Sequence, residues 1–434
     1  MKELIVIGGG LAGCEAAWQA AKSNVKVVLY EMRPTKFTEA HKTGLLGELV
    51  CSNSLRSADP MSATGLLKRE LQMADSLIMA AAEAARVPAG SAFAVDRAAF
   101  AGFITEAISD NENIRVVREE VREIPDTFSI VATGPLTSEA MADALRRLMG
   151  SEYLSFYDAI APILDAESID YEKVFFASRY GKGGDDYINC PMTREEYEVF
   201  YDALLEADRV NRRAFEDEKV FESCMPVEVM ALRGRDTMRF GPMKPVGLKD
   251  PRTGRDPFAV VQLRQENNEK TAYNMVGFQT RLIVPEQKRV FRLIPGLEHA
   301  EFLRFGSIHR NTFINSPFFV DRDLSLRLGQ NVYLAGQITG VEGYIESTAA
   351  GLLAGINAAR RMDGRYPLDV PPTTAHGSLV RHITSETRDF QPSNINFGLF
   401  PQAESDRGDK KVRRRLLVER ALEDWDIFVK RAME

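Results

Sequence analysis

The sequence predicts an α/β fold in which a nucleotide-binding domain is interrupted by an inserted α+β domain. Three observations support this prediction. A strand, a glycine-rich turn, a helix and a second strand follow one another over residues 4–31. A buried-strand pattern returns at residues 331–335, after a long central stretch of different texture. The chain of 434 residues has room for two or three domains at roughly 150 residues each.

The first element is a short apolar run, Leu4–Ile7, which is typical of a buried parallel strand. The GxGxxG spacing that follows opens an Ala-rich helix. In this spacing the first glycine permits a tight turn, the second lets the backbone approach a pyrophosphate, and the third lets helix and strand pack closely. The helix N-terminus offers unpaired N–H groups to phosphates. We therefore expect a dinucleotide to bind at Gly8, Gly9, Gly10, Leu11, Ala12 and Gly13.

The second strand, predicted over residues 25–30, ends at Glu31. An acidic residue at this place in a Rossmann-type fold accepts hydrogen bonds from the adenosine ribose hydroxyls. Strand, helix, strand and carboxylate thus occur in the order that dinucleotide binding requires, which makes the signal more specific than a lone glycine motif. The alternative is a glycine-rich turn that serves packing alone.

The remaining elements follow in order. Helices are expected near residues 66–85 and 97–108, and strands over 114–122 and 129–135, the second of which is stopped by its final Gly-Pro pair. From residue 151 strands, turns and helices mix, and Pro, Gly and aromatic residues become frequent. Helices are expected again over 342–361 and 410–431. We therefore assign residues 1–150 and 326–434 to a discontinuous nucleotide-binding domain, and 151–325 to an inserted domain on the substrate side.

Two later segments favour FAD over NAD. Residues 130–134 resemble the Ala-Thr-Gly strand of FAD-dependent oxidoreductases with a glutathione-reductase-like fold. Residues 334–346 resemble their closing element, in which a late strand feeds a helix whose N-terminus faces the flavin. Many such proteins carry Gly-Asp where this chain carries Gly-Gln, so the role of that Asp has no direct counterpart. The residues expected to contribute to FAD binding here are Gly134, Gly336, Gln337, Ile338 and Tyr344.

Composition narrows the classes of partner and compartment. The formal net charge of −7 argues against a surface that attracts polyanions everywhere, but leaves room for a local basic patch. No apolar run approaches the ~18 residues of a membrane span. The N-terminal residues lack the longer apolar region and cleavage site of a signal peptide. We therefore expect a cytoplasmic protein without a membrane segment.

The four cysteines are scattered, without a CxxC pair or a metal-ligand cluster, so we expect free thiols and no metal site. Cys14 and Cys190 suit small buried hydrophobic positions. Cys51 and Cys224 lie in polar, turn-prone surroundings, and they are the candidates for reactivity.

At this point the sequence resembles a known family, the bacterial FAD- and folate-dependent tRNA uracil-5-methyltransferases called TrmFO. The resemblance covers nearly the whole chain, and its most specific stretches are residues 6–17, 49–57, 224–228, 233–236, 240–248, 336–344 and 394–398. The related tRNA-modifying flavoproteins MnmG (GidA) share the N-terminal Gly-Gly-Gly-x-Ala-Gly-Cys-Glu-Ala pattern. They are longer and carry an extra C-terminal helical domain, so the length of 434 residues argues against membership among them.

The resemblance implies methylation at C5 of a T-loop uridine in tRNA. It implies methylenetetrahydrofolate as the one-carbon donor, reduced FAD as the reductant, and NADH or NADPH as the source of electrons. It also implies that Cys224 is the nucleophile and Cys51 the proton-abstracting partner. Such chemistry suits thiols, because a thiolate that adds to C6 of uracil makes C5 enolate-like. A base then removes the C5 proton, and hydride from the flavin completes the methyl group.

Three further residues are candidates for substrate contact. His309 is a candidate to stack on the folate pteridine, with a structural histidine as the alternative. Arg233 and Arg235 are candidates for tRNA phosphate contacts or for lowering the pKa of a thiol. The basic run at residues 410–415 is more typical of a solvated helix face. The alternative functions are MnmG-like modification of a wobble uridine, a flavin thiol/disulfide oxidoreductase, and an FAD-bound RNA-binding scaffold.

Overall fold

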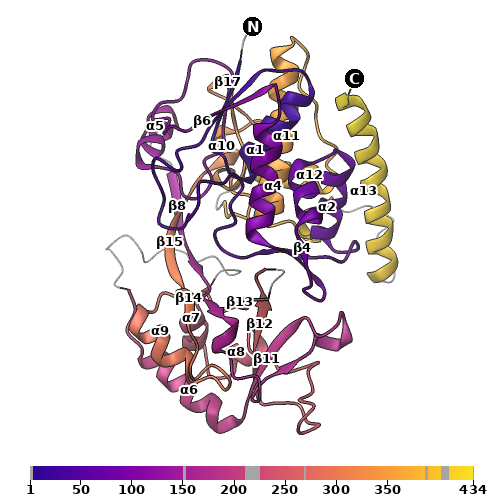
Figure 1. Cartoon of the computed structure of the whole chain (residues 1–434). Coiled ribbons are helices and arrows are strands. Elements are labelled where there is room, and N and C mark those ends of the chain that lie inside the picture. The colour runs from indigo at the N-terminus through magenta and orange to yellow at the C-terminus, as the bar shows by residue number, and fades with distance from the viewer. Residues whose placement is uncertain are drawn as a thin grey trace.

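A computed structural model describes residues 3–149, 153–210, 225–267, 270–386, 390–401 and 410–433. These residues form two lobes, one above the other in Figure 1. A long two-stranded antiparallel ribbon joins the lobes, and it consists of β8 (Tyr153–Ile160) and β15 (Ser307–Ile314). No helix among the described residues is both long enough and apolar enough to cross a membrane.

The upper lobe is built on a six-stranded sheet of order β16-β17-β7-β1-β2-β6. Its strands are β1 (Leu4–Ile7), β2 (Val27–Tyr30), β6 (Ile114–Val117), β7 (Ser129–Val131), β16 (Ser325–Leu326) and β17 (Gly329–Leu334). All neighbours pair in parallel except β16, which is antiparallel to β17. Apolar β-branched strands suit a parallel sheet that is covered on both faces. The predicted α/β Rossmann-type fold is confirmed.

Two helices from opposite ends of the chain cross closely over this sheet. They are α1 (Leu11–Lys22) and α11 (Tyr344–Met362). A Cβ atom at Gly351 would lie 2.2 Å from the Ala12 carbonyl oxygen, and one at Gly355 would lie 2.4 Å from that of Ala16. Only glycine therefore allows the two backbones to approach this far. The crossing joins the N-terminal and the late segments into one hydrophobic core.

Further helices and a small sheet complete the upper lobe. The sheet has the order β3-β5-β4. The predicted helix over 66–85 is two helices, because Asp75 adopts a positive φ of 52° and the Ser76 hydroxyl caps the second helix at the Met79 N–H. The predicted strand over 114–122 stops at Val117. The bounds are β3 (Ser54–Ser57), β4 (Arg86–Val87), β5 (Ala92–Val95), α2 (Ala63–Met73), α3 (Leu77–Ala84), α4 (Arg97–Ser109), α5 (Glu139–Met149), α10 (Ser316–Phe319), α12 (Ala375–Thr384), η5 (Phe397–Leu399) and α13 (Lys410–Met433).

The C-terminal helix α13 packs on the upper lobe through five buried side chains, Val418, Ala421, Trp425, Phe428 and Val429. Trp425 is fully buried, and its ring stacks on that of His376 with centroids 4.0 Å apart. Its indole N–H donates to the Glu70 carbonyl oxygen at 2.6 Å. The tail helix is therefore part of the core of this lobe.

The lower lobe is built on an antiparallel six-stranded sheet of order β10-β11-β12-β13-β9-β14. The helices α6, α7, α8 and α9 contribute side chains to a second hydrophobic core, which is separate from the first. Every residue of the central strand β12 is buried. The bounds are β9 (Ile163–Asp165), η1 (Ala166–Ser168), β10 (Phe175–Phe176), η2 (Arg179–Gly181), β11 (Tyr187–Met192), α6 (Arg194–Glu206), α7 (Val227–Leu232), α8 (Thr237–Phe240), β12 (Ala259–Gln265), β13 (Ala272–Met275), α9 (Val284–Phe291) and β14 (Phe302–Arg304).

The two sheets divide along the chain in a way that supports the proposed domain organisation. Every described strand of the lower sheet lies between residues 163 and 304, and those of the upper sheet lie at 4–131 and 325–334. We propose an inserted domain within 151–325, between the two parts 1–150 and 326–434. Phe313, Ile314 and Val320 already belong to the upper core, so the chain returns to the upper lobe somewhat before residue 326.

Candidate functional site

A cavity of about 1280 Å³, including its open mouth, runs along the carboxyl ends of the upper strands. This edge is where open parallel sheets bind their ligands. Cys51, His41 and Glu48 line the cavity together with most of the residues expected to bind the cofactor. Those residues are Gly8, Gly9, Gly10, Leu11, Ala12, Glu31, Gly134, Gly336, Gln337 and Tyr344.

The glycine loop has the geometry that a pyrophosphate needs. Gly8 has a φ of +111°, and a Cβ there would lie 2.5 Å from the Ala132 carbonyl oxygen. A Cβ at Gly10 would meet nothing within 4 Å, so this glycine leaves open space. Helix α1 begins after Gly10 without a side-chain cap. Its first N–H groups are therefore available to an anion.

Two of the expected cofactor-binding residues lie behind the cavity. A Cβ at Gly13 would lie 1.8 Å from the Gly8 carbonyl oxygen, so Gly13 serves the packing of α1 on the loop. Ile338 lies in the short helix η4 (Gln337–Thr339), and its side chain is fully buried in the upper core. Neither Gly13 nor Ile338 is among the residues that line the cavity.

Glu31 lines the cavity at the end of β2. Burial alone would raise the pKa of this carboxyl, but hydrogen bonds and the charge of Arg33, together with the Gly9 N–H, outweigh that effect and lower it. The carboxylate accepts from the Gly9 N–H at 3.0 Å and from three N–H groups of Arg33 at 2.9–3.0 Å. These bonds use the four acceptor positions of a carboxylate. A ribose hydroxyl therefore has to compete with Arg33 for Glu31.

His41 lies in the same part of the cavity and was not expected from the sequence. Its Nδ1 lies 2.7 Å from the Thr38 hydroxyl. Burial and the nearby charge of Arg33 together lower the pKa of His41 to about 4. The imidazole is therefore neutral at physiological pH.

The opposite wall of the cavity is formed by residues from 336 to 347, which follow β17 and begin α11. Gly336 has a φ of +82°, and a Cβ there would lie 2.8 Å from that of Ala12. The Gln337 amide donates to the Glu342 carboxylate at 3.1 Å, so this side chain is already engaged where related flavoproteins carry Asp. Helix α11 begins at Tyr344 after Gly343 without a side-chain cap. A second helix N-terminus is thus directed at the cavity.

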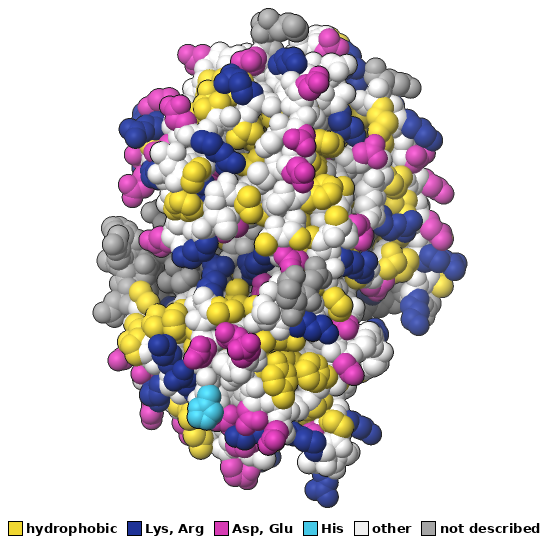
Figure 2. Space-filling model, viewed as in Figure 1, with side chains coloured by type: hydrophobic (Ala, Val, Ile, Leu, Met, Phe, Trp, Pro, Cys, Tyr) yellow, Lys and Arg dark blue, Asp and Glu magenta, His cyan; other side chains and the backbone are white. Residues whose placement is uncertain are grey.

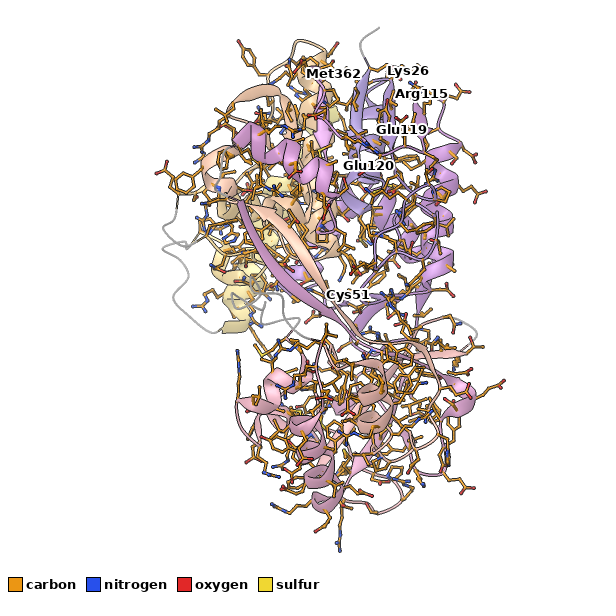
Figure 3. The ribbon with its side chains drawn as sticks, turned by 90° about the vertical axis from the view of Figure 1, so that its left-hand side faces the viewer. Lys26, Cys51, Arg115, Glu119, Glu120 and Met362 are labelled. Carbon is orange, nitrogen blue, oxygen red and sulfur yellow. The ribbon has the colours of Figure 1, made fainter. Side chains whose placement is uncertain are left out.

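Cys51 lies at the boundary between the lobes, at the lower edge of the upper lobe in Figure 3. The Tyr344 hydroxyl oxygen accepts from the N–H groups of Cys51 at 2.8 Å and Ser52 at 3.3 Å. Burial raises the pKa of Tyr344 far above its usual value, so the phenol keeps its proton. The Tyr344 phenol therefore connects the start of α11 to the backbone of the Cys51 segment.

Two arginines beside Cys51 were also missed by sequence reasoning. Arg97 pairs with Glu266 through Nε and Oε2 at 2.5 Å, and it donates to the Cys51 carbonyl oxygen at 3.3 Å. Arg264 donates to the Asn53 side-chain oxygen at 2.9 Å. The one available signal was the polar residues at 262 and 264–266 at the end of a strand that begins with an apolar run. On the face shown in Figure 2, Lys and Arg side chains are prominent along the boundary between the lobes.

The structure does not bring Arg233 and Arg235 to the cavity lining. Both follow α7 in the lower lobe. Arg235 forms ion pairs with Glu198 and Asp202, and its guanidinium lies 4.5 Å from the centroid of the Tyr201 ring. Binding a phosphate would require it to leave these partners.

Two other predicted residues fall in parts that are less fully described. Cys224 lies outside the described residues. His309 lies in β15 opposite Asp158, but its side chain is outside the described part. Cys14 and Cys190 are fully buried, and burial raises the pKa of both thiols, as expected of packing residues. No group of His, Cys, Asp and Glu that is suited to a metal ion occurs among the described residues.

Fold and site together define the class of protein. A parallel sheet with a glycine loop, an uncapped α1 and a late helix closing the cavity is the architecture of an FAD-binding flavoprotein of the GidA-like type. The family model described as "Glucose inhibited division protein A" matches residues 3–366. The solved structure of Aquifex aeolicus GidA in its form II crystal superposes with a TM-score of 0.73 at 17% identity, covering 99% of this chain and 74% of that chain. At this identity the likeness concerns the fold.

Full-length relatives narrow the class further. The protein of Moorella thermoacetica named methylenetetrahydrofolate–tRNA-(uracil-5-)-methyltransferase TrmFO is 59% identical to this chain, over 98% of each chain. Two further relatives bear the same name. The one from Geobacter sulfurreducens is 59% identical over 97% of each chain, and the one from Aquifex aeolicus is 55% identical over 99% of this chain and 97% of the relative. The chain belongs to the TrmFO family, within the wider GidA family.

Proposed function

We propose that this chain methylates C5 of a T-loop uridine in tRNA, with methylenetetrahydrofolate as the one-carbon donor. The observation that carries the proposal is the position of Cys51. It lines the cavity that the glycine loop and α11 enclose, in a chain whose full-length relatives bear the name of that activity. A cytoplasmic location belongs to the same proposal, because tRNA is found there.

The residues of the cavity fit FAD. The uncapped N-terminus of α1 and the open space at Gly10 suit the pyrophosphate, and the N-terminus of α11 suits the electron-rich part of a flavin. When bound and reduced by NADH or NADPH, FAD supplies the hydride that completes the methyl group. Glu31, Gly134, Gly336 and Gln337 would hold it along the cavity.

The two thiols would divide the chemistry on the uracil ring. Family resemblance assigns the nucleophile to Cys224, whose thiolate adds to C6 and raises the electron density at C5. C5 then forms its bond to the one-carbon unit, and Cys51 removes the C5 proton as a general base while the one-carbon unit separates from the nitrogen that carried it. Addition of hydride to the remaining methylene would complete the methyl group and expel the Cys224 thiolate from C6, which restores the ring. His309 would stack on the folate pteridine, and Arg233 would approach the tRNA phosphates. Arg235 could do so only by leaving Glu198 and Asp202, with which it forms ion pairs.

The alternative functions are less well supported. The full-length TrmFO relatives are 55–59% identical, while the GidA structure is 17% identical, which disfavours an MnmG-like activity. A flavin thiol/disulfide oxidoreductase would carry two cysteines close together in the sequence on a helix beside the flavin. The two candidate thiols here, Cys51 and Cys224, lie 173 positions apart.

The test is methylation of unmodified tRNA by the purified chain with methylenetetrahydrofolate and NADPH, read as 5-methyluridine by mass spectrometry. We expect Cys51→Ala and Cys224→Ala to abolish the product. Cys190→Ala, at a buried thiol of the lower core, is the matched control and should retain it. Absence of 5-methyluridine with the wild-type chain, or full activity of Cys51→Ala, would refute the proposal.

A further inference from the structure

The segment that carries Cys51 has no regular structure of its own. Residues 50–53 lie between turns and the strand β3. A backbone bond from the Val95 N–H to the Asn53 carbonyl oxygen, at 3.0 Å, ties the end of the segment to β5, but no ladder runs along the segment. Side chains from three different elements hold the segment instead. Tyr344 of α11 binds its amides from the side of the cavity, and the other two elements are α4 and β12.

Arg97, the first residue of α4, holds the carbonyl side of the segment. Its guanidinium donates to the carbonyl oxygens of Leu49 and Cys51. The Nε of the same group binds Glu266, at the end of β12, at 2.5 Å. Glu266 is itself only 4% exposed. The Arg97 guanidinium therefore binds both the Cys51 segment and the end of the lower sheet.

Arg264 of β12 holds the residues that follow Cys51. It donates to the Ser52 hydroxyl at 2.8 Å and to the Asn53 side-chain oxygen at 2.9 Å. Asn53 is fully buried, and its amide nitrogen donates to the carbonyl oxygens of Val95 and Gln265 at 3.0 Å each. The lower sheet is thus bonded directly to the two residues after the thiol.

We propose that Arg264 and Arg97 are positioning residues for Cys51. Through them, the lower sheet determines the position of the Cys51 thiol relative to the uridine. The proposal rests on the proposed function, in which Cys51 removes the C5 proton. Proton transfer requires reacting atoms within about 3–3.5 Å, and a displacement of about 1 Å is costly for the rate. A lysine cannot replace the fork of an arginine that bonds two acceptors at once.

The chain offers a matched control for Arg264. Arg179 donates to the Gln262 side chain at 2.8 Å and to the Val246 carbonyl oxygen at 3.0 Å. Gln262 lies two residues before Arg264 on β12, so both side chains leave the same face of the strand. Arg179 therefore also bonds two acceptors at once, one on β12 and one on Val246, and neither lies in the Cys51 segment.

The experiment compares Arg264→Lys with Arg179→Lys in the full-length holoprotein. The measurements are kcat and KM for tRNA methylation, FAD content, and the rate at which iodoacetamide alkylates Cys51 without RNA, followed by peptide mass spectrometry. For Arg264→Lys we expect kcat to fall about tenfold or more, with KM for tRNA within about twofold and FAD content unchanged. The alkylation rate should change at least about threefold. Arg179→Lys should leave all four quantities close to wild type.

Two results would overturn the proposal. One is an Arg264→Lys variant with wild-type kcat and alkylation rate. The other is an equal loss of kcat in Arg179→Lys, which would show that any weakened contact on this face of β12 is sufficient. If the wild-type chain fails to methylate tRNA, the proposed function fails, but the alkylation comparison still decides whether Arg264 places Cys51.

Discussion

The two lobes contribute to the site in different ways. The upper lobe contributes backbone: the glycine loop, the uncapped starts of α1 and α11, and the carboxyl ends of parallel strands. The lower lobe contributes side chains that leave one strand, Arg264 and Glu266. A backbone site depends on where glycine is required. A side-chain site depends on which strand positions meet another lobe, and this is settled only in the folded molecule.

The largest expected effect tests the backbone site. Gly13→Ala should abolish FAD binding and destabilise the upper lobe by about 3 kcal/mol or more, because its Cβ would lie 1.8 Å from the Gly8 oxygen. Gly10→Ala is the control, since its Cβ meets no atom within 4 Å. We expect it to keep the stability of the apoprotein and lower FAD affinity alone. Urea unfolding and flavin titration measure both, and equal stability loss in the two variants would contradict the argument.

The next effect tests the side chains between the lobes. Glu266→Gln removes the carboxylate that pairs with Arg97, and breaking a buried pair in this way costs about 3 kcal/mol. Glu298→Gln breaks the exposed pair with Lys173 in the lower lobe and should cost much less. Urea midpoints of the two variants give the comparison. Similar shifts would mean that the pair between the lobes is no more important than a surface pair.

A smaller effect concerns pH and the upper lobe. The pKa of His41 is about 4 in the folded chain against 6.5 for the ordinary side chain, so the unfolded chain binds the proton more tightly between these values. The free energy of unfolding therefore carries no penalty from His41 above pH 6.5, and it decreases as the pH falls towards 4. At pH 5.5 the loss should be about 1 kcal/mol. His41→Gln should remove this part of the pH dependence in melting curves at pH 7.5 and 5.5, and an unchanged dependence would contradict it.

The smallest effect concerns a residue that the sequence marked for RNA. Because the structure pairs Arg235 with Glu198 and Asp202, Arg235→Gln should change the KM for tRNA by less than about twofold, as expected of an exposed ion pair. The salt dependence of tRNA binding should keep its slope. A slope lowered by about one unit would show instead that Arg235 contacts a phosphate.

The sequence predicted the parts of the site that depend on backbone chemistry. Gly8, Gly10 and Glu31 line the cavity, and their spacing follows from the geometry of one strand–helix–strand unit. Gln337 and Tyr344 also line it, and they stand out in the sequence because the late strand and helix resemble the closing element of other flavoproteins. Their roles toward a cofactor stay predictions. These signals lie within short stretches of chain, so they can be read before the fold is known.

The parts that were missed depend on contacts between distant segments. Arg97 begins an ordinary helix, and nothing near it in the sequence indicates a bond to the carbonyl of Cys51. Arg264 was visible only as the one charged residue of the strand β12. Glu31 was found, but its saturation by Arg33 was not. Arg235 is a candidate for RNA contact because basic residues cluster in the sequence near Cys224. Its carboxylate partners lie more than thirty residues earlier in the chain, so the sequence did not indicate these ion pairs.

The close crossing of α1 and α11 imposes an order of events on biosynthesis. Strand β7 lacks its β17 neighbour, and the glycine loop lacks its opposite wall, until the last quarter of the chain has left the ribosome. At about 5–20 residues per second, the N-terminal unit waits on the order of tens of seconds. The lower sheet closes earlier, because its strands all lie between residues 163 and 304. The nascent chain therefore finishes its inserted lobe first and captures FAD only near the end of translation.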